Sequence, residues 1–465
     1  MKKLPVIDLF AGPGGLAEGF SSIIKEKQRV FEIKLSIEKD ESAHKTLELR
    51  SFCRQFPKDE LPEEYYAVLR ETELKSREEK KIQLFKKFDI EYEAAKKEAW
   101  LAELGNTKYP PSLVDQRIKE VLKGEKDWVL IGGPPCQAFS LVGRSRVGGV
   151  HEEDHRVFLY KEYLRIIAEH QPAVFVMENV KGLLSASING EKIFNWILRD
   201  LRNPSSVFKK TANTKYKVYS LVNSVIQHDK DYLIKAEKYG IPQKRHRVIL
   251  LGIREDLNVI PKIIDKKEKV TLKSVIDKLP KIRSSINRKF IYSEIINGKK
   301  KRKYKKLLDD SHIWERQMNI FKNEIISWNG LTNYTNKEEV IASKFCKGAE
   351  FVPALNTIEK NHTLTNWYLD KKLDGIPNHQ SRSHLLEDLK RYMFASIFTL
   401  SEGRFPRMQD YEKHNEDLLP DHKSAKTGKF ADRFRVQLPN EPATTVTSHI
   451  SKDGHYFIHL SSQLN

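Results

Sequence analysis

The stretch that decides the fold is PVIDLFAGPGGLAEGF, residues 5–20. It opens with an apolar run as long as a buried strand, continues with the glycine-rich turn AGPGG, and leads into the helix-like LAEGFSSIIKEK. Glycines after a first strand let the backbone approach a nucleotide-like ligand closely. A turn of this composition can also lack a ligand. The stretch therefore predicts a strand–turn–helix unit and leaves its ligand open.

The same alternation continues along the first half of the chain. Helix-like segments at 41–56 and 156–170 separate further strand-like runs, which are IKLSIEKD, DWVLIGG, PAVFVMENV, KVYSLVNS and RHRVILLGI. This order predicts an α/β fold with a mostly parallel, doubly wound sheet. Ligands bind such sheets at the carboxyl ends of the strands. Asp8, Glu38 and Glu178 fall at or near these ends.

Composition divides the chain into segments. Residues 53–126 are rich in Glu, Lys and Ala with helical spacing, and we interpret them as a helical insertion in the alternating strand–helix domain that spans 1–255. Residues 256–440 are rich in Lys, Asn and Ile and lack a strong period, which indicates a second, smaller mixed domain. We expect residues 441–465 to return toward the first domain.

The positive charge is confined to one part of the chain. Residues 1–200 hold 33 Lys and Arg against 33 Asp and Glu, whereas 201–465 hold 49 against 30, which is the whole excess of 19. A neutral half joined to a basic half suggests a small-molecule site and a polyanion partner. Ordinary solubility charge remains the alternative. The run KKKRKYKK (299–306) is typical of an exposed segment and could also lie on a phosphate backbone.

Cysteine usage and hydropathy narrow the setting. The chain has three cysteines and no CxxC pair, so we expect neither a disulfide framework nor a metal site. The first residues make a poor signal peptide, and no run of 18 apolar residues occurs. The expectation is a soluble protein of a reducing cytoplasm.

One cysteine has the surroundings of a nucleophile. In LIGGPPCQAFS (130–140), Cys136 follows a buried strand and two prolines. A thiolate nucleophile needs a polar, partly exposed position, which a strand exit beside a helix start supplies. A buried, inert cysteine would not require the preceding GGPP, so we favour a reactive thiol.

Polar side chains at two other strand ends could assist that thiol. Glu178 ends an apolar strand, where loss of water favours the neutral acid and makes it a candidate proton donor. A carboxylate at a helix N-terminus is the competing interpretation. Gln243, Arg245 and Arg247 alternate, so within a strand they would share one face and could steady a carboxylate, a base or a phosphate. A solvated edge strand is the alternative there.

Taken in order, these motifs resemble one enzyme family. DLFAGPGGLAEGF, GGPPCQAFS, MENVKG and GIPQKRHRV closely resemble the DNA cytosine-5 methyltransferases, and PNEPATTVTSHISKDGHYFIH (439–459) is similar to the end of that family's target-recognition region. The resemblance covers about 4–52, 127–255 and the last thirty or so residues. The Pro-Cys-Gln and Glu-Asn-Val pair, in this order behind the glycine-rich turn, is highly specific.

The resemblance implies an activity and a set of site residues. It implies methyl transfer from S-adenosyl-L-methionine to C5 of a flipped-out cytosine in a specific duplex sequence, through a Cys136–C6 adduct, as in bacterial restriction–modification. The implied catalytic residues are Cys136, Glu178, Arg245 and Arg247. The implied cofactor-binding residues are Phe10, Ala11, Gly12, Gly14, Glu38 and Pro135. The implied DNA-binding residues are Gln137, Ser140, Arg144, Arg146 and Gln243. The resemblance also implies that 1–255 is the catalytic methyltransferase domain and that 256–440 is a basic target-recognition domain.

The chain also departs from the family pattern. The third cofactor-binding acid has no clear place, and the region of Glu103–Asn106 is a guess. The last two family motifs should follow KDGHYFIH, but LSSQLN follows instead. The expectation is that a second polypeptide supplies those motifs, and that a cognate restriction endonuclease accompanies the enzyme. A tRNA cytosine-5 methyltransferase and a DNA-binding chain that is inactive alone remain the alternatives.

Overall fold

The structure is a computed structural model. It describes residues 2–135, 155–188, 190–208, 214–297, 299–328, 330–331, 334–336, 338–420, 434–446, 455 and 457–460. The chain divides into two compact units. The first comprises Met1–Pro62, Ile82–Tyr239 and Arg245–Lys267, and the second comprises Glu63–Lys81, Gly240–Lys244 and Glu268–Asn465.

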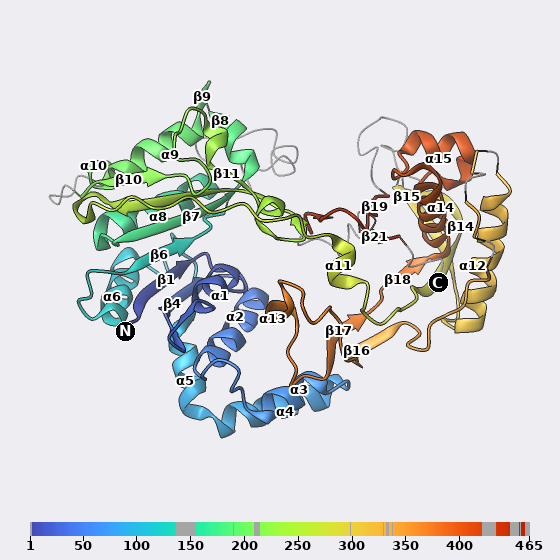
Figure 1. Ribbon diagram of the computed structural model, residues 1–465, viewed down its shortest axis with the longest axis horizontal. Coiled ribbons are helices and arrows are strands. Elements are labelled where there is room, and N and C mark those ends of the chain that lie inside the picture. Colours follow the sequence, from blue (N-terminus) through green and yellow to red (C-terminus); the bar gives the residue numbers. More distant parts are fainter. Residues whose placement is uncertain are drawn as a thin grey trace. The chain divides into compact units, whose positions relative to one another are not determined.

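The first unit is built on an eight-stranded sheet (Figure 1). Its order is β10-β13-β7-β6-β1-β4-β5, with β11 pairing β13. All pairs from β7 to β5 are parallel, whereas β13 runs antiparallel to β7, β10 and β11. This confirms the predicted α/β class. The strands are β1 (Leu4–Leu9), β4 (Phe31–Glu38), β5 (Ala99–Leu101), β6 (Val129–Gly132), β7 (Val174–Val180), β10 (Tyr216–Tyr219), β11 (Leu233–Lys235) and β13 (His246–Arg254).

The period of two along each strand explains how the sheet is covered. In β1, Ile7 and Leu9 belong to a large core cluster with helices α6 (Pro111–Leu122), α8 (His155–His170) and α9 (Ile193–Arg202). Val6 points to the other face and joins a smaller cluster that includes Ala17 of α1 (Gly15–Ser21). Helices therefore lie on both faces of the sheet, as the strand–helix alternation predicts.

The interval 53–126 is divided differently from the expected insertion. Its α5 (Asp89–Glu98) leads directly into β5, which pairs with β4 as an edge strand of the main sheet, and its α6 packs in the large core cluster. Glu98, at the end of α5, pairs with Arg54 of α2 (Glu41–Arg54) and accepts a hydrogen bond from Ser51. Only part of the interval is thus an addition to the sheet. The sequence pattern did not predict β5, because a three-residue strand is too short to be recognised by alternation.

The second unit is a mixed α/β body whose core lies around α14. Trp314 and Met318 of α12 pack in one fully buried cluster with Leu389 and Met393 of α14. Its helices are α3 (Glu63–Arg70), α4 (Leu74–Lys87), α11 (Leu272–Ile276), α12 (Ser311–Ile326), α13 (Thr365–Tyr368), α14 (Leu386–Glu402) and α15 (Met408–His414). Its strands are β12 (Gln243–Lys244), β14 (Ser285–Ile296), β15 (Lys299–Lys306), β16 (Gly348–Pro353), β17 (Gly375–Gln380), β18 (Ser383–Leu385), β19 (Val436–Gln437), β20 (Ala443–Thr444) and β21 (Ile458–His459).

Part of the expected insertion belongs to this second unit. In α3, Tyr66 donates a hydrogen bond to Asp370 at 3.1 Å, and Arg70 donates from Nε to the carbonyl of Leu373 at 3.2 Å. Arg77 at the start of α4 forms an ion pair with Glu350 of β16 at 3.0 Å. The chain therefore passes from the second unit to the first within α4, after Lys81.

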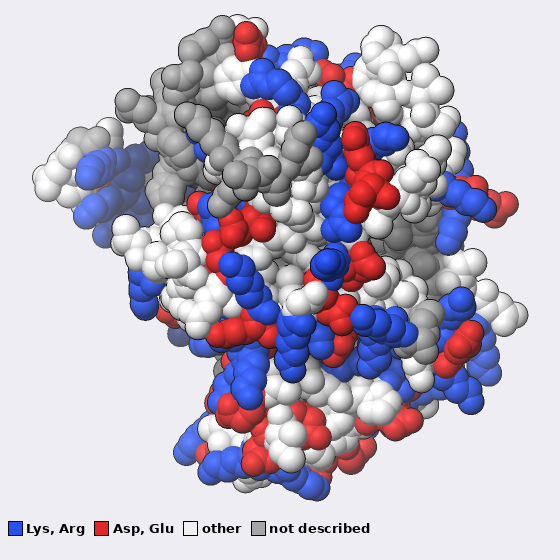
Figure 2. Space-filling model, turned by 90° about the vertical axis from the view of Figure 1, so that its left-hand side faces the viewer, with Lys and Arg blue, Asp and Glu red and all other residues white. Residues whose placement is uncertain are grey.

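The C-terminal segment also differs from expectation. Its strand β20 pairs in parallel with β12, and β21 pairs in parallel with β19, so 441–465 groups with the second unit rather than with the catalytic domain. Among the described residues, no helix combines the length and apolarity that a membrane crossing requires. On the face that Figure 2 shows, acidic and basic side chains are interspersed.

Candidate functional site

The carboxyl ends of five parallel strands meet at one edge of the sheet, and the sequence places most candidate residues there. The glycine-rich turn after β1 holds three residues in left-handed conformations, with φ of 56° at Phe10, 57° at Gly12 and 85° at Gly14. A non-glycine residue such as Phe10 adopts this conformation at a cost of about 1 kcal/mol or more, a strain that concentrates at ligand sites.

Two glycines of this turn differ in what surrounds the position that a Cβ would occupy. A Cβ at Gly14 would lie 2.8 Å from Cδ1 of Leu47 on α2, so this glycine is needed for packing. A Cβ at Gly12 would meet nothing within 4 Å. The backbone at Gly12 therefore borders open space, as a turn that admits a ligand requires.

The end of β4 faces the same turn. The carboxylate of Glu38 accepts three backbone hydrogen bonds, from the N–H groups of Gly12 at 2.7 Å, Lys39 at 2.9 Å and Asp40 at 2.8 Å. These bonds fix the carboxylate beside the glycine-rich turn. A carboxylate held there can accept hydrogen bonds from the hydroxyl groups of a ribose.

The next strand end carries a second acid. Glu103 lies just after β5, where it accepts hydrogen bonds from Nζ of Lys39 and Nδ2 of Asn106, both at 2.9 Å. The N–H of Ala102 donates to the carbonyl of Glu38 at 3.0 Å, so Glu38 and Glu103 end neighbouring strands. The sequence pointed to this region without choosing the residue, because β5 itself was not recognised.

The two glycines after β6 allow close approach on both sides. A Cβ at Gly132 would lie 2.6 Å from the carbonyl oxygen of Leu9 in β1, and one at Gly133 would lie 3.3 Å from Oε2 of Glu178 in β7. Gly132 therefore lets β6 pack against β1, and Gly133 leaves room for a carboxyl group. The GGPP motif thus reflects the crowding of three strand ends.

Glu178 faces two guanidinium groups. Its Oε1 lies 2.6 Å from Nε of Arg247 and 3.7 Å from Nη2 of Arg245, and its side chain is 22% exposed. Because β13 is antiparallel to β7, its first residues reach the edge where β7 ends. Burial, and then the charge of Arg247, lower the pKa of Arg245. The arrangement is a three-member charge cluster that is open to solvent on one side.

Asn179 is a positioning residue that the sequence reasoning missed. It is 4% exposed, its Oδ1 accepts a hydrogen bond from the N–H of Val180 at 2.8 Å, and its Nδ2 contacts the carbonyl of Pro134 at 3.5 Å. The side chain thus connects β7 to the proline pair before Cys136. Its place in the quoted MENVKG motif was the available signal.

Asp8 is the most deeply buried acid near this edge. It is 0% exposed in the middle of the sheet, and desolvation raises the pKa of its carboxyl to about 8, against the opposing charge of Arg54. The sequence placed Asp8 near a strand exit and assigned it no role. A neutral carboxylic acid at this depth is a feature that only the burial reveals.

The structure brings some predicted residues together and separates others. Arg245 and Arg247 approach Glu178, but Gln243 lies in the short strand β12 and pairs with Ala443 in the second unit. The interpretation that all three share one strand face is therefore wrong, because the strand is interrupted between Lys244 and His246. Pro135 is half-buried at the end of the described segment. The predicted residues that lie outside the described residues are Cys136, Gln137, Ser140, Arg144 and Arg146.

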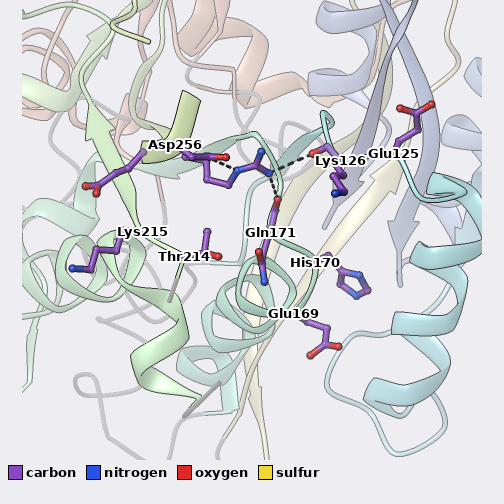
Figure 3. A pocket seen from close by; sticks show the side chains of 10 residues that line it. Glu125, Lys126, Glu169, His170, Gln171, Thr214, Lys215 and Asp256 are labelled. Atoms are coloured by element: carbon purple, nitrogen blue, oxygen red, sulfur yellow. Dashed lines mark hydrogen bonds and ion pairs between the residues drawn. The ribbon is translucent and has the colours of Figure 1, made fainter. Parts of the chain in front are cut away.

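A polar pocket of about 630 Å³ lies elsewhere (Figure 3). Arg254, at the end of β13, donates to the carbonyl of Gln171 at 2.8 Å and to Asp256 at 2.7 Å. Lys126 and Gln171 precede β6 and β7, so this pocket is at the opposite edge of the sheet. Among the described residues that line it, none is a candidate catalytic residue.

Known proteins are similar to this chain in sequence, over part or most of its length. The family described as "C-5 cytosine-specific DNA methylase" matches residues 106–393. The chain is 27% identical over 470 residues to the type II methyltransferase M.Bpa9945I of Bacillus paralicheniformis, covering 98% of this chain and 86% of the relative. It is 34% identical over 170 residues to the type II methyltransferase M.FnuDI of Fusobacterium nucleatum, covering 35% and 42%. A solved structure described as the Entamoeba histolytica methyltransferase EhMeth is 15% identical with a TM-score of 0.30, covering 61% and 68%.

Proposed function

The chain belongs to the family of C-5 cytosine-specific DNA methylases, and from this membership we propose that it methylates C5 of a cytosine in duplex DNA through a covalent bond between Cys136 and C6. S-adenosyl-L-methionine supplies the methyl group when bound. The target base must leave the helix, because C5 and C6 cannot be reached inside the stack.

One observation carries the proposal. The carboxyl group of Glu178 lies against Gly133, the neighbouring Asn179 contacts the carbonyl of Pro134, and Cys136 is only two residues beyond Pro134 along the chain. An acid beside the segment that bears a thiol is the arrangement that addition to a pyrimidine ring requires.

The proposed reaction follows the electrons around the ring. The thiolate of Cys136 adds to C6, while Glu178 holds the N3 and N4 edge and gives a proton to N3. The displaced electron pair makes C5 nucleophilic, and C5 takes the methyl group. Loss of the C5 proton to solvent then expels Cys136 and restores the C5–C6 double bond, and the N3 proton returns to Glu178.

Two arginines keep the acid in place. Arg247 and Arg245 hold Glu178 in place through ion pairs of 2.6 and 3.7 Å. The two guanidinium groups are rich in donors and can also support the base or a nearby phosphate. Asn179 fixes the backbone of the proline segment relative to β7. These roles position the reacting groups rather than transfer protons.

The first four strand ends fit the cofactor. The open backbone at Gly12 would admit the methionine end, Phe10 would hold the adenine, Glu38 and Glu103 would accept hydrogen bonds from the ribose and the base, and Pro135 would border the transfer site. The sharp turn leaves no side chain in the way at Gly12, which is the structural basis for assigning the group here.

We further propose that the enzyme acts in bacterial restriction–modification, within the cytoplasm, beside an endonuclease of the same specificity. The relatives that carry this proposal are the type II methyltransferases. Arg144 and Arg146, which lie outside the described residues, are proposed to contact the DNA backbone.

Trapping tests the chemistry. The purified chain is incubated with S-adenosyl-L-methionine and duplex DNA that contains 5-fluorocytosine, where fluorine at C5 cannot leave as the proton does. We expect a covalent adduct that maps to Cys136 by mass spectrometry, and none with Cys136→Ser, because a hydroxyl is a far weaker nucleophile. Cys346→Ser is the matched control, since Cys346 is an exposed thiol of the second unit.

The same experiment separates the alternatives. Adduct formation on a tRNA and not on duplex DNA would identify a tRNA methyltransferase, and DNA binding without an adduct would identify a binding protein. Bisulfite sequencing of DNA from cells that express the chain then gives the target sequence.

A further inference from the structure

The strands β14 and β15 pair antiparallel, and β18 joins β14 only at Ser285–Arg288, so from Lys289 to Lys305 they form a two-stranded ribbon with an extreme charge. Residues 285–306 contain nine Lys and Arg and one acid, Glu294. The ribbon contains the basic run KKKRKYKK, to which the proposed chemistry gives no role. Its residues are largely exposed, including Ile295 at 78% and Tyr292 at 51%.

The register of the ribbon assigns its side chains to two faces. Phe290 lies opposite Tyr304, and these rings contact each other edge to face at 6.0 Å between centroids. Together with Arg302 they line a cavity of about 480 Å³ with residues at the start of α14, and the N–H of Phe290 donates to Glu387 there. This face is therefore directed toward the body of the second unit.

The other face carries lysines at alternate positions. Tyr292 lies opposite Lys303, and Glu294 opposite Lys301, on this outer face. Lysines two residues apart on one strand are spaced by about 6.8 Å. The lysines of the outer face are Lys289, Lys299, Lys301, Lys303 and Lys305.

The outer face is electrostatically unfavourable by itself. Lys289 lies directly opposite Lys305, and like charges in that position destabilise a strand pair. Lys303 has an ion pair with Glu294 at 3.1 Å, which offsets one of the five charges. A surface that concentrates four more charges of one sign matches a polyanion and not a mixed protein surface.

We propose that this ribbon lies in the major groove of the duplex, with the outer-face lysines contacting phosphates. The inference rests on the proposed function, which makes duplex DNA the polyanion. A groove about 12 Å wide accepts a two-stranded ribbon, whose strands are about 4.8 Å apart. Tyr292, on the same outer face, would then face base edges, where apolar contact with the methyl group distinguishes thymine.

Salt dependence tests the phosphate contacts. The variant Lys299→Gln, Lys301→Gln, Lys303→Gln, Lys305→Gln is compared with wild type for binding to a duplex that carries the target site. We expect the slope of log K against log salt to fall in magnitude by about 0.9 for each phosphate that is no longer neutralised, thus by roughly 3 to 4. The control variant, with the same charge change at Lys58, Lys75, Lys86 and Lys97, should keep the slope.

Dimethyl sulfate footprinting tests the groove, because guanine N7 lies in the major groove. At saturating protein, wild type should protect guanines that stay reactive with Tyr292→Ala, because Tyr292 is the side chain placed at the base edges. An unchanged slope, or unchanged protection with Tyr292→Ala, would overturn the inference, and an unchanged thermal unfolding profile of each variant verifies that the second unit, which contains the ribbon, is intact. Failure of the proposed function appears separately, as absence of the 5-fluorocytosine adduct with wild-type protein.

Discussion

The buried carboxyl group of Asp8 makes a prediction about stability and pH. It is 0% exposed within the central strand β1, and burial raises its pKa from 3.8 to about 8. Between these two pH values the folded chain keeps a proton that the unfolded chain has released. The stabilising contribution of the neutral acid is thus fully present below pH 3.8 and is lost as the pH rises through 8.

The size of the effect follows from one proton. The free energy of unfolding should fall by about 1.4 kcal/mol for each pH unit between these limits, which is roughly 4 kcal/mol from pH 5 to pH 8. Asp8→Asn keeps the shape of the side chain and cannot ionise. Its own cost, an extra buried N–H donor, does not change with pH, so the variant should gain on the wild type steadily as the pH rises.

Urea unfolding at pH 5, 6, 7 and 8, followed by circular dichroism, measures this difference. The matched control is Asp256→Asn, because the hydrogen bond from Arg254 holds the pKa of Asp256 below 3.8 and this group stays ionised throughout the range. The control should therefore differ from wild type by a constant amount. If the stability of Asp8→Asn ran parallel to that of wild type from pH 5 to 8, Asp8 would be ionised in the fold and the reasoning would be refuted.

Three further predictions concern the site. Glu178→Gln should lower kcat by about 10²- to 10⁴-fold while target DNA still binds, measured by tritiated methyl transfer, because the amide cannot donate a proton to N3. Gly133→Ala should lower kcat and change the free energy of unfolding little, since its Cβ would lie 3.3 Å from Oε2 of Glu178; thermal unfolding measured beside the rate assay separates the two effects. Gly12→Ala has room for its Cβ but a φ of 57°, so calorimetry should show weaker S-adenosyl-L-methionine binding and a stability loss of about 1 kcal/mol.

Much of the first unit could be predicted from local patterns. A buried parallel strand needs a continuous apolar run, and PVIDLF, DWVLIGG and PAVFVMENV all became strands of the sheet. The short strand β5 was missed because three residues carry no readable period. Its absence from the prediction also left Glu103 unassigned and made α6 look like part of an insertion.

The order of motifs along the chain, read from the sequence alone, was sufficient for the fold class and the enzyme family, because strand-forming runs and turn glycines are local properties. Only the tertiary structure decided which groups meet. The antiparallel direction of β13 brings Arg245 and Arg247 to Glu178, and the pairing of β12 with β20 takes Gln243 into the second unit. These outcomes depend on contacts between residues far apart in sequence, as does the burial that keeps Asp8 neutral, and no local pattern encodes them.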